Sequence, residues 1–69
     1  MRTSARNQLH GRVTEVTIGA VMAEIMVEVS GQRIVAAITK DSAERLGLEP
    51  GAAVTVIVKA TDVMIGVDD

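Results

Sequence analysis

The run from Val21 to Val29 constrains the fold of this chain more than any other segment, because its side chains alternate strictly. Aliphatic residues occupy positions 21, 23, 25, 27 and 29, while Met and Glu take the positions between them. A period of two residues is typical of a strand with one buried face. Ser30–Gln32 then reads as a hairpin turn, and Arg33–Ile38 is predicted to return as the next strand.

Three other segments also read as strands. Gln8–Ile18 precedes the hairpin, and its broken alternation predicts a bulge near Gly11. Val54–Lys59 is apolar at four of its first five positions, so we expect it to be buried on both faces. Val63–Val67 is predicted to close the fold as the last strand.

One short helix is predicted between the third and fourth strands. Thr39 is a suitable N-cap, Lys40–Leu46 follows as the helix, and Gly47 stops it. Five short strands with one helix in this position are typical of an OB-like barrel. The sequence therefore predicts an all-β fold, a small five-stranded OB-like barrel.

The composition limits how such a small fold is stabilised. Sixty-nine residues make one domain, and a core of this size barely offsets the entropy of ordering the chain. The chain has no Cys and one His, which excludes disulfides, thiolate metal sites and a zinc site built from histidines. All of its hydrophobic share of 48% is aliphatic or Met, and oligomerisation is the reinforcement that remains.

Charge and motif content argue against several classes of function. The net charge is −2 and no aromatic residue is present, so the basic stripe and stacking platforms of nucleic-acid binders are missing. No apolar run approaches the roughly 20 residues of a membrane span, and no secretory signal is visible. No catalytic triad or phosphate-binding loop is present. We expect a cytoplasmic protein that is not an enzyme and that binds neither nucleic acid nor membrane.

Three clusters carry groups suited to a small oxyanion, which needs hydrogen-bond donors and modest positive charge from several directions. The first is Ser4, Ala5, Arg6 and Asn7, and the second is Lys59, Ala60 and Thr61. The third runs from Thr39 to Ser42, where the first helical turn leaves N–H groups free.

Each cluster also has a plainer interpretation. Ser4–Asn7 fits a solvated chain end, and Lys59 fits a charge at the edge of a sheet. Thr39 could serve only as a cap, and Asp41 disfavours an anion unless its carboxylate points away. One cluster alone therefore predicts little.

Taken together, the clusters follow the order of a known family. Residues 4–11 read Ser-Ala-Arg-Asn-Gln-Leu-x-Gly, and the matching positions that follow are Gly19-Ala20-Val21, Ala23-Glu24, Ile38-Thr39, Ser42, Leu46-Gly47-Leu48, Gly51 and Lys59-Ala60-Thr61. This set resembles the molbindins, the small molybdate-binding Mop proteins that also occur as modules of regulators and transport ATPases. The resemblance covers nearly the whole chain and implies a single molbindin domain over residues 1–69.

The resemblance implies reversible binding of molybdate or tungstate at subunit interfaces, for intracellular storage and homeostasis, with no cofactor. It implies that one chain supplies Ser4, Ala5, Arg6, Lys59 and Ala60 and that its neighbour supplies Thr39 and Ser42. A second site, on a threefold axis, would use main-chain groups of Gly19, Ala20 and Val21, although a plain tight turn explains this segment equally well. The family's hexamer, a trimer of dimers, is implied too; the residues by themselves indicate only an oligomer.

Two alternatives remain open. Ile38–Gly51 is similar to swapped-hairpin transcription factors, which would make the chain a DNA-binding regulator module. The acidic balance opposes that reading, and it leaves Ser4–Leu9 unexplained. The other alternative is a structural oligomerisation or regulatory domain of a larger transporter or regulator. Because the motifs begin soon after Met1 and end soon after the last predicted strand, we expect a free-standing protein.

Overall fold

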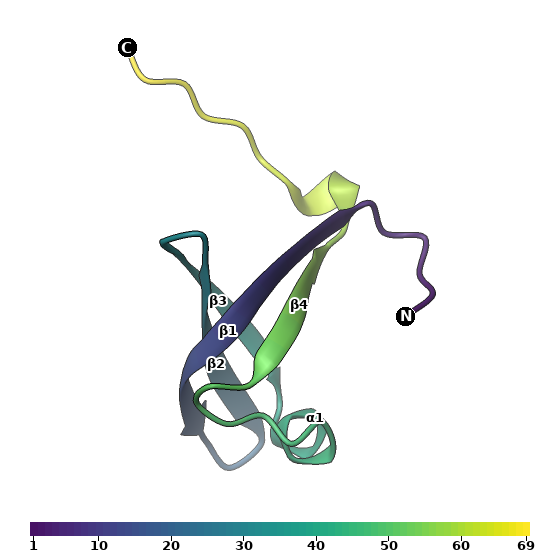
Figure 1. Cartoon of the computed structure of the whole chain (residues 1–69), viewed down its shortest axis with the longest axis vertical. Helices are drawn as coiled ribbons and strands as arrows, with labels where there is room; N and C mark the ends of the chain where they lie inside the picture. Colours follow the sequence, from purple (N-terminus) through teal and green to yellow (C-terminus); the bar gives the residue numbers. More distant parts are fainter.

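A computed structural model describes all 69 residues and shows a four-stranded antiparallel sheet with one short helix (Figure 1). The order of strands across the sheet is β3-β2-β1-β4. The elements are β1 (Asn7–Ile18), β2 (Met22–Val29), β3 (Gln32–Thr39), the helix α1 (Lys40–Arg45), β4 (Ala53–Val58) and the 3₁₀ turn η1 (Ala60–Asp62). The mostly-β class, the central hairpin and the helix between the third and fourth strands are confirmed.

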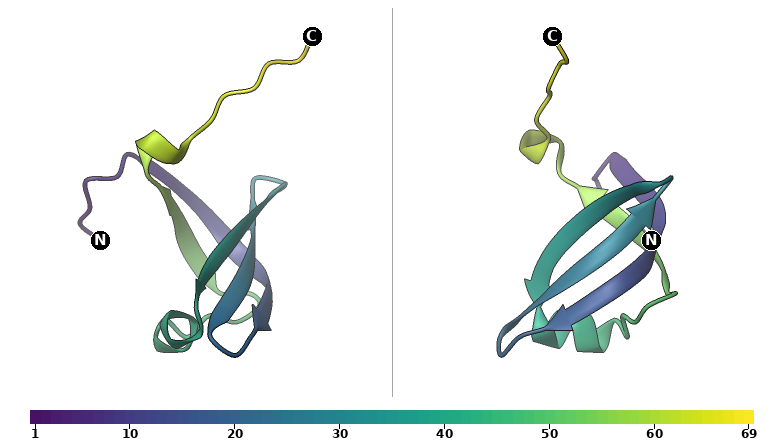
Figure 2. Two further views of the ribbon diagram at one scale, coloured as in Figure 1. Left: turned by 180° about the vertical axis from the view of Figure 1, so that it is seen from behind. Right: turned by 90° about the vertical axis from the view of Figure 1, so that its left-hand side faces the viewer.

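β1 holds the sheet together because it pairs along different halves with two partners. Its first half pairs with β4, from Asn7 opposite Val58 to Arg12 opposite Ala53. Its second half pairs with β2, up to Ile18 opposite Ala23. The sheet consequently bends along β1, and the four strands curve around one side (Figure 2).

Gly11 lies where the backbone of β1 closely approaches β2. A Cβ atom at this position would lie 2.5 Å from the carbonyl oxygen of Glu28 and 2.8 Å from a methyl group of Val27. The glycine is required by this close approach. The irregularity of the ladder itself lies between Val13 and Glu15, so the predicted bulge is displaced along the strand.

The core is small and comes mainly from the hairpin. Five of the 69 residues are buried, and they are Val13, Ala23, Ile25, Val27 and Ala43. The buried face predicted for β2 is thus confirmed at its three central positions. Val21 is an exception, because it lies in the turn before β2 and is 72% exposed. Ala43 brings α1 against the same core.

The predicted fifth strand and the closed barrel do not form within one chain. Residues 63–69 lie outside every helix and strand, and β3 and β4 remain free edges of the sheet. The turn η1 is held by Asp62 N–H donating to Lys59 O at 2.9 Å and Val63 N–H donating to Ala60 O at 3.3 Å. It directs the C-terminal segment away from the sheet (Figures 1 and 2), so the backbone of that segment meets no strand of its own chain.

β4 was expected to be buried on both faces, and this is wrong for a single chain. No residue of β4 is fully buried, and Ile57 is 45% exposed. The reason is that the sheet does not close into a barrel, so no other strand of the chain packs over the second face of β4.

Candidate functional site

The two ends of the sheet-forming region meet at one place. Asn7 at the start of β1 pairs with Val58 at the end of β4, so the residues just outside these strands become neighbours. Together they line a pocket of about 340 Å³, whose six lining residues are Ser4, Ala5, Arg6, Lys59, Ala60 and Thr61. Two clusters that lie more than fifty positions apart in the sequence thus form one site.

This pocket, which we call the terminal pocket, is rich in donors that have no partner. The chain contains one ion pair, Arg45 with Asp41, so neither Arg6 nor Lys59 is neutralised by a carboxylate. The backbone N–H groups of Arg6, Lys59 and Ala60 make no hydrogen bond within the chain, and neither does the hydroxyl of Ser4.

Ala5 fixes the shape of the N-terminal wall. Its N–H donates to Thr3 Oγ1 at 3.2 Å, and its carbonyl accepts from Gln8 Nε2 at 2.9 Å. The amide of Ala5 is therefore occupied, and the donors available to a ligand are those on either side of it. Two cations and several N–H groups around one small pocket suit an anion whose atoms all accept hydrogen bonds.

Thr39 and Ser42 lie at the opposite end of the sheet. α1 sits at the far end of β1 from η1 (Figure 1), and Thr39 pairs with Met22 at the start of β2. Within one chain these two residues do not reach the terminal pocket. A single site that uses both sets of residues requires a second chain.

The start of α1 is largely satisfied by its own groups. Thr39 Oγ1 donates to Ser42 Oγ at 2.8 Å and accepts from Ser42 N–H at 3.1 Å. Lys40 N–H donates to Val21 O at 2.8 Å, so little of the predicted free N–H character of the first turn remains. Ser42 Oγ accepts from both Thr39 and Arg45, which leaves its own hydrogen available to a ligand.

Asp41 does not oppose an anion at Ser42 as strongly as its sequence position suggests. Its carboxylate accepts from Arg45 Nε at 3.2 Å, and the pair is exposed. The negative charge therefore has a positive partner on the surface of the helix.

The segment Gly19–Val21 forms the turn between β1 and β2. Gly19 N–H donates to Met22 O at 2.8 Å, and a Cβ at Gly19 would lie 2.9 Å from that same oxygen. The N–H groups of Ala20 and Val21 make no hydrogen bond and both residues are exposed. Val21 O accepts the hydrogen bond from Lys40 N–H, so this segment contacts the start of α1. Nothing in the sequence predicted this proximity.

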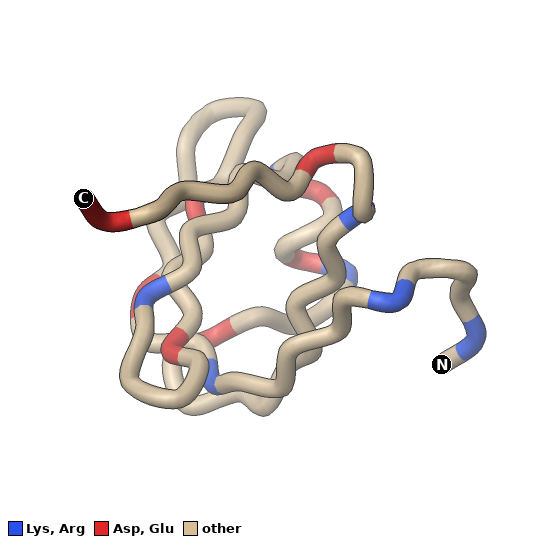
Figure 3. Tube along the Cα trace, turned by 90° about the horizontal axis from the view of Figure 1, so that it is seen from above, with Lys and Arg blue, Asp and Glu red and all other residues tan.

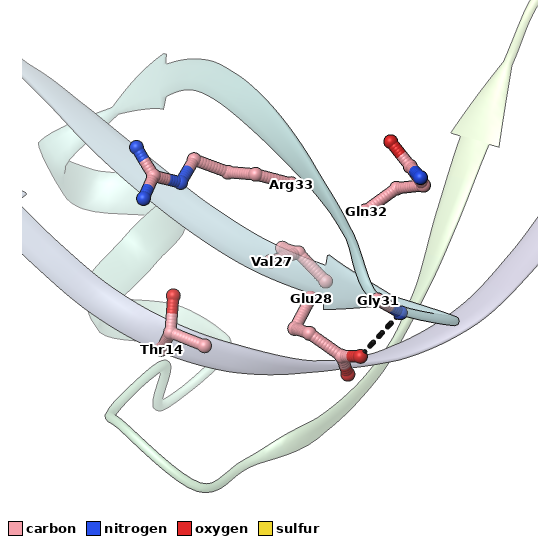
Figure 4. A pocket seen from close by; sticks show the side chains of 6 residues that line it. All are labelled: Thr14, Val27, Glu28, Gly31, Gln32 and Arg33. Carbon is pink, nitrogen blue, oxygen red and sulfur yellow. Dashed lines mark hydrogen bonds between the residues drawn. The ribbon is translucent and has the colours of Figure 1, made fainter.

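Two polar pockets lie elsewhere on the strands. One of about 300 Å³ lies beside the β2–β3 turn, where Glu28 Oε1 accepts from Gly31 N–H at 2.6 Å (Figure 4). Glu28 thus secures the hairpin. The other pocket lies over β1 and β4, where His10 Nδ1 is 3.3 Å from Thr55 Oγ1. Neither pocket was predicted, since its residues are scattered along strands without a motif.

Charged residues of both signs are interspersed around the molecule. Figure 3 shows Lys and Arg at several positions on the side of the N-terminus, red Asp at the C-terminal end, and both signs elsewhere along the trace. No group of three or more His, Cys, Asp or Glu side chains is placed to hold a metal ion. None of the helices has the length and apolar character needed to cross a bilayer.

Comparison with known proteins identifies the family. The TOBE domain family model matches residues 3–65. Molybdenum-pterin-binding protein 2 of Clostridium pasteurianum is 48% identical over 66 residues, which are 94% of this chain and 97% of that protein. The chain belongs to the Mop family. The resemblance to molbindins is thereby confirmed, and as a Mop protein the chain is a binding protein and not an enzyme.

Solved structures of Mop proteins share the fold. A molybdate-binding protein of Sporomusa ovata has a TM-score of 0.90 and 46% identity, covering 94% of this chain and 97% of that one. The cytoplasmic molybdate-binding protein ModG, solved with molybdate bound, has a TM-score of 0.91 and 40% identity. That match covers 99% of this chain and 49% of ModG, so the chain spans about half of ModG.

Proposed function

We propose that this protein reversibly binds molybdate or tungstate at the contacts between its subunits. The observation that carries the proposal is the terminal pocket, where Arg6 and Lys59 face one small space without a carboxylate partner. Membership of the Mop family and the molybdate bound to ModG support this choice of anion.

In the proposed site, one chain supplies Ser4, Ala5, Arg6, Lys59 and Ala60, and its neighbour supplies Thr39 and Ser42. Ala5 lines the pocket without donating, because its N–H is bonded to Thr3 Oγ1. Arg6 and Lys59 balance the charge of the dianion, while the hydroxyls and main-chain N–H groups replace its hydration shell. The separation of the two sets along β1 is what makes a second chain necessary.

A second oxyanion site is proposed at Gly19, Ala20 and Val21. Its donors would be the unpaired N–H groups of Ala20 and Val21. One chain offers only two such groups, so several copies must meet around a symmetry axis to surround an anion.

The biological role that fits these sites is storage and homeostasis of the oxyanion in the cytoplasm, by a homo-oligomer built as a hexamer of three dimers. The accessible surface favours an oligomer, since 5602 Å² exceeds the roughly 4,100 Å² expected of a folded monomer of this mass. In the assembled protein the OB-like barrel would also be closed by a fifth strand.

Calorimetric titration with molybdate tests the proposal. Wild type should bind molybdate in the presence of excess sulfate, because a cavity shaped for the larger anion discriminates by size. Arg6→Ala should weaken binding by roughly 10- to 100-fold, since it removes a charged hydrogen bond. Arg2→Ala is the matched control: it removes the same charge from a neighbouring position that does not line the pocket.

Two results would contradict the proposal. One is an absence of binding to molybdate and tungstate by folded, assembled protein. The other is an equal loss of binding in Arg2→Ala and Arg6→Ala. That result would mean that binding depends only on the overall charge of the protein and not on the terminal pocket.

A further inference from the structure

The two walls of the terminal pocket are held in place by different means. The C-terminal wall, Lys59–Thr61, belongs to the turn η1, which is closed by two backbone hydrogen bonds. The N-terminal wall, Ser4–Arg6, lies before β1 and makes no hydrogen bond between backbone groups. The first wall is therefore fixed by the main chain, whereas the position of the second depends on side chains.

One side chain connects the N-terminal wall to the sheet. Gln8 Nε2 donates to Ala5 O at 2.9 Å. The other hydrogen bond of this wall, from Ala5 N–H to Thr3 Oγ1 at 3.2 Å, stays within the N-terminal segment. Gln8 itself is well placed, because its backbone lies in β1 opposite Ile57 of β4. The separation of the two walls thus depends on the amide group of Gln8.

The hydrogen bond from Gln8 also orients a donor of the pocket. The carbonyl of Ala5 and the N–H of Arg6 belong to one planar trans peptide group, so they point in opposite directions. Holding the carbonyl toward Gln8 therefore holds the Arg6 N–H on the other side of the chain. That N–H has no partner within the protein and remains available to an anion.

Gln8 lies outside the pocket whose wall it holds. It does not line the pocket, and it is exposed. Its influence on a bound anion is therefore exerted through the position of Ser4–Arg6. Because substitutions at exposed positions usually change stability little, Gln8 can be altered without unfolding the protein.

We propose that Gln8 is a positioning residue that sets the size of the anion accepted by the terminal pocket, an inference that rests on the proposed function of that pocket. Molybdate and sulfate are both tetrahedral dianions and differ mainly in size, so charge and donors alone do not distinguish them. Two walls at a fixed separation favour the anion that fits between them, whereas a mobile wall closes on either anion. A wall that is ordered beforehand also avoids the entropic cost of ordering it on binding.

Competition between molybdate and sulfate in Gln8→Met tests the proposal, because methionine keeps the length of the side chain but has no donor. Calorimetric titration with molybdate at several sulfate concentrations gives the ratio of the two affinities. We expect this ratio to fall by roughly three- to tenfold, as for the loss of one hydrogen bond. Gln32→Met is the matched control, since Gln32 is exposed and lies outside the terminal pocket. Its ratio should stay within about twofold of wild type.

Two results of the titrations would overturn the proposal. One is an unchanged ratio in Gln8→Met, even if both affinities fall, because a residue that only supports the fold weakens both anions alike. The other is an equal fall of the ratio in Gln32→Met, because the effect would then not come from the hydrogen bond to Ala5.

A measurement without any anion separates this proposal from the proposed function. Backbone order parameters from NMR relaxation of the assembled protein should fall at Ala5 and Arg6 in Gln8→Met, from about 0.85 to below about 0.6, and stay unchanged at Ala60. Unchanged order parameters at Ala5 and Arg6 would refute the positioning role even if molybdate binds. If wild type binds neither anion, the proposed function and the size selection both fail, while the order parameters still decide whether Gln8 positions the wall.

Discussion

The two sides of the sheet differ in how completely residues of their own chain bury and pair them. On the hairpin side, β2 lies between β1 and β3, and Ala23, Ile25 and Val27 are at most 3% exposed. On the other side, β4 pairs with β1 alone, and its residues are half-buried or exposed. The hairpin side is therefore complete within one chain, whereas the β4 side is left open and could be completed only by another copy under the proposed assembly. Substitutions on the two sides should differ in whether their effects depend on protein concentration.

The largest effect is expected at Ile25. Ile25→Ala removes buried methyl groups from the core and should lower the free energy of unfolding by about 2–5 kcal/mol. Urea denaturation at two protein concentrations measures it, and the loss should be the same at both. A loss that shrinks on dilution would mean that this core, too, depends on assembly.

The next largest effect on stability is expected at Gly11. Gly11→Ala places a Cβ against the carbonyl oxygen of Glu28, which is backbone and cannot move aside as a side chain can. We expect a loss of about 1–3 kcal/mol in the same denaturation experiment, as for other overpacked positions. Gly66→Ala is the control, since a Cβ there meets nothing. Equal stability of Gly11→Ala and wild type would show that β2 can shift away from β1.

At the end of the hairpin, Thr39 should have a moderate effect. Thr39→Ala removes the cap of α1 and its bond to Ser42, at a cost of about 1 kcal/mol. Thr39→Ser keeps the hydroxyl and should restore most of that stability. Thermal unfolding followed by circular dichroism distinguishes the pair. If serine and alanine behave alike, the methyl group of Thr39, rather than its hydroxyl, is what stabilises the helix.

The smallest effect in dilute solution is expected at Ile57. Ile57→Ala should change the stability of the separated chain by only about 0.5 kcal/mol, because the side chain is already 45% exposed. As the protein concentration rises and copies assemble, the loss should grow. Sedimentation and denaturation at matched concentrations measure both quantities. A loss of stability that is the same at every protein concentration would contradict the proposed difference between the hairpin side and the β4 side.

The sequence was a good guide where neighbouring residues decide the outcome. The alternation of β2, the hairpin turn, the Thr39 cap and the stop at Gly47 all follow from residues within a few positions, and all are present. Prediction from the sequence failed where a segment becomes a strand only if it has a partner strand to pair with. Val63–Val67 has the composition of a strand, but a strand needs an edge to pair with, and η1 turns this segment away from both edges of its own chain.

For the candidate site the division is similar. Motifs alone selected Ser4–Arg6 and Lys59–Ala60, and the structure brings these two sets together around the terminal pocket. The same motifs selected Thr39, Ser42 and Gly19–Val21, but they gave no indication that these three meet at the other end of the molecule. That neighbourhood depends on the hydrogen bond from Lys40 N–H to Val21 O, between residues nineteen positions apart.

By itself, the sequence determined the local elements, the family and the chemical nature of the donors, because side-chain period, capping and donor type are properties of the residues themselves. Only the tertiary structure decided that Arg6 and Lys59 share a pocket, that Thr39 lies at the opposite end of β1, and that β4 stays a free edge of the sheet. Those outcomes depend on strand register and on the direction in which η1 releases the chain, and both are set by contacts between residues far apart in the sequence.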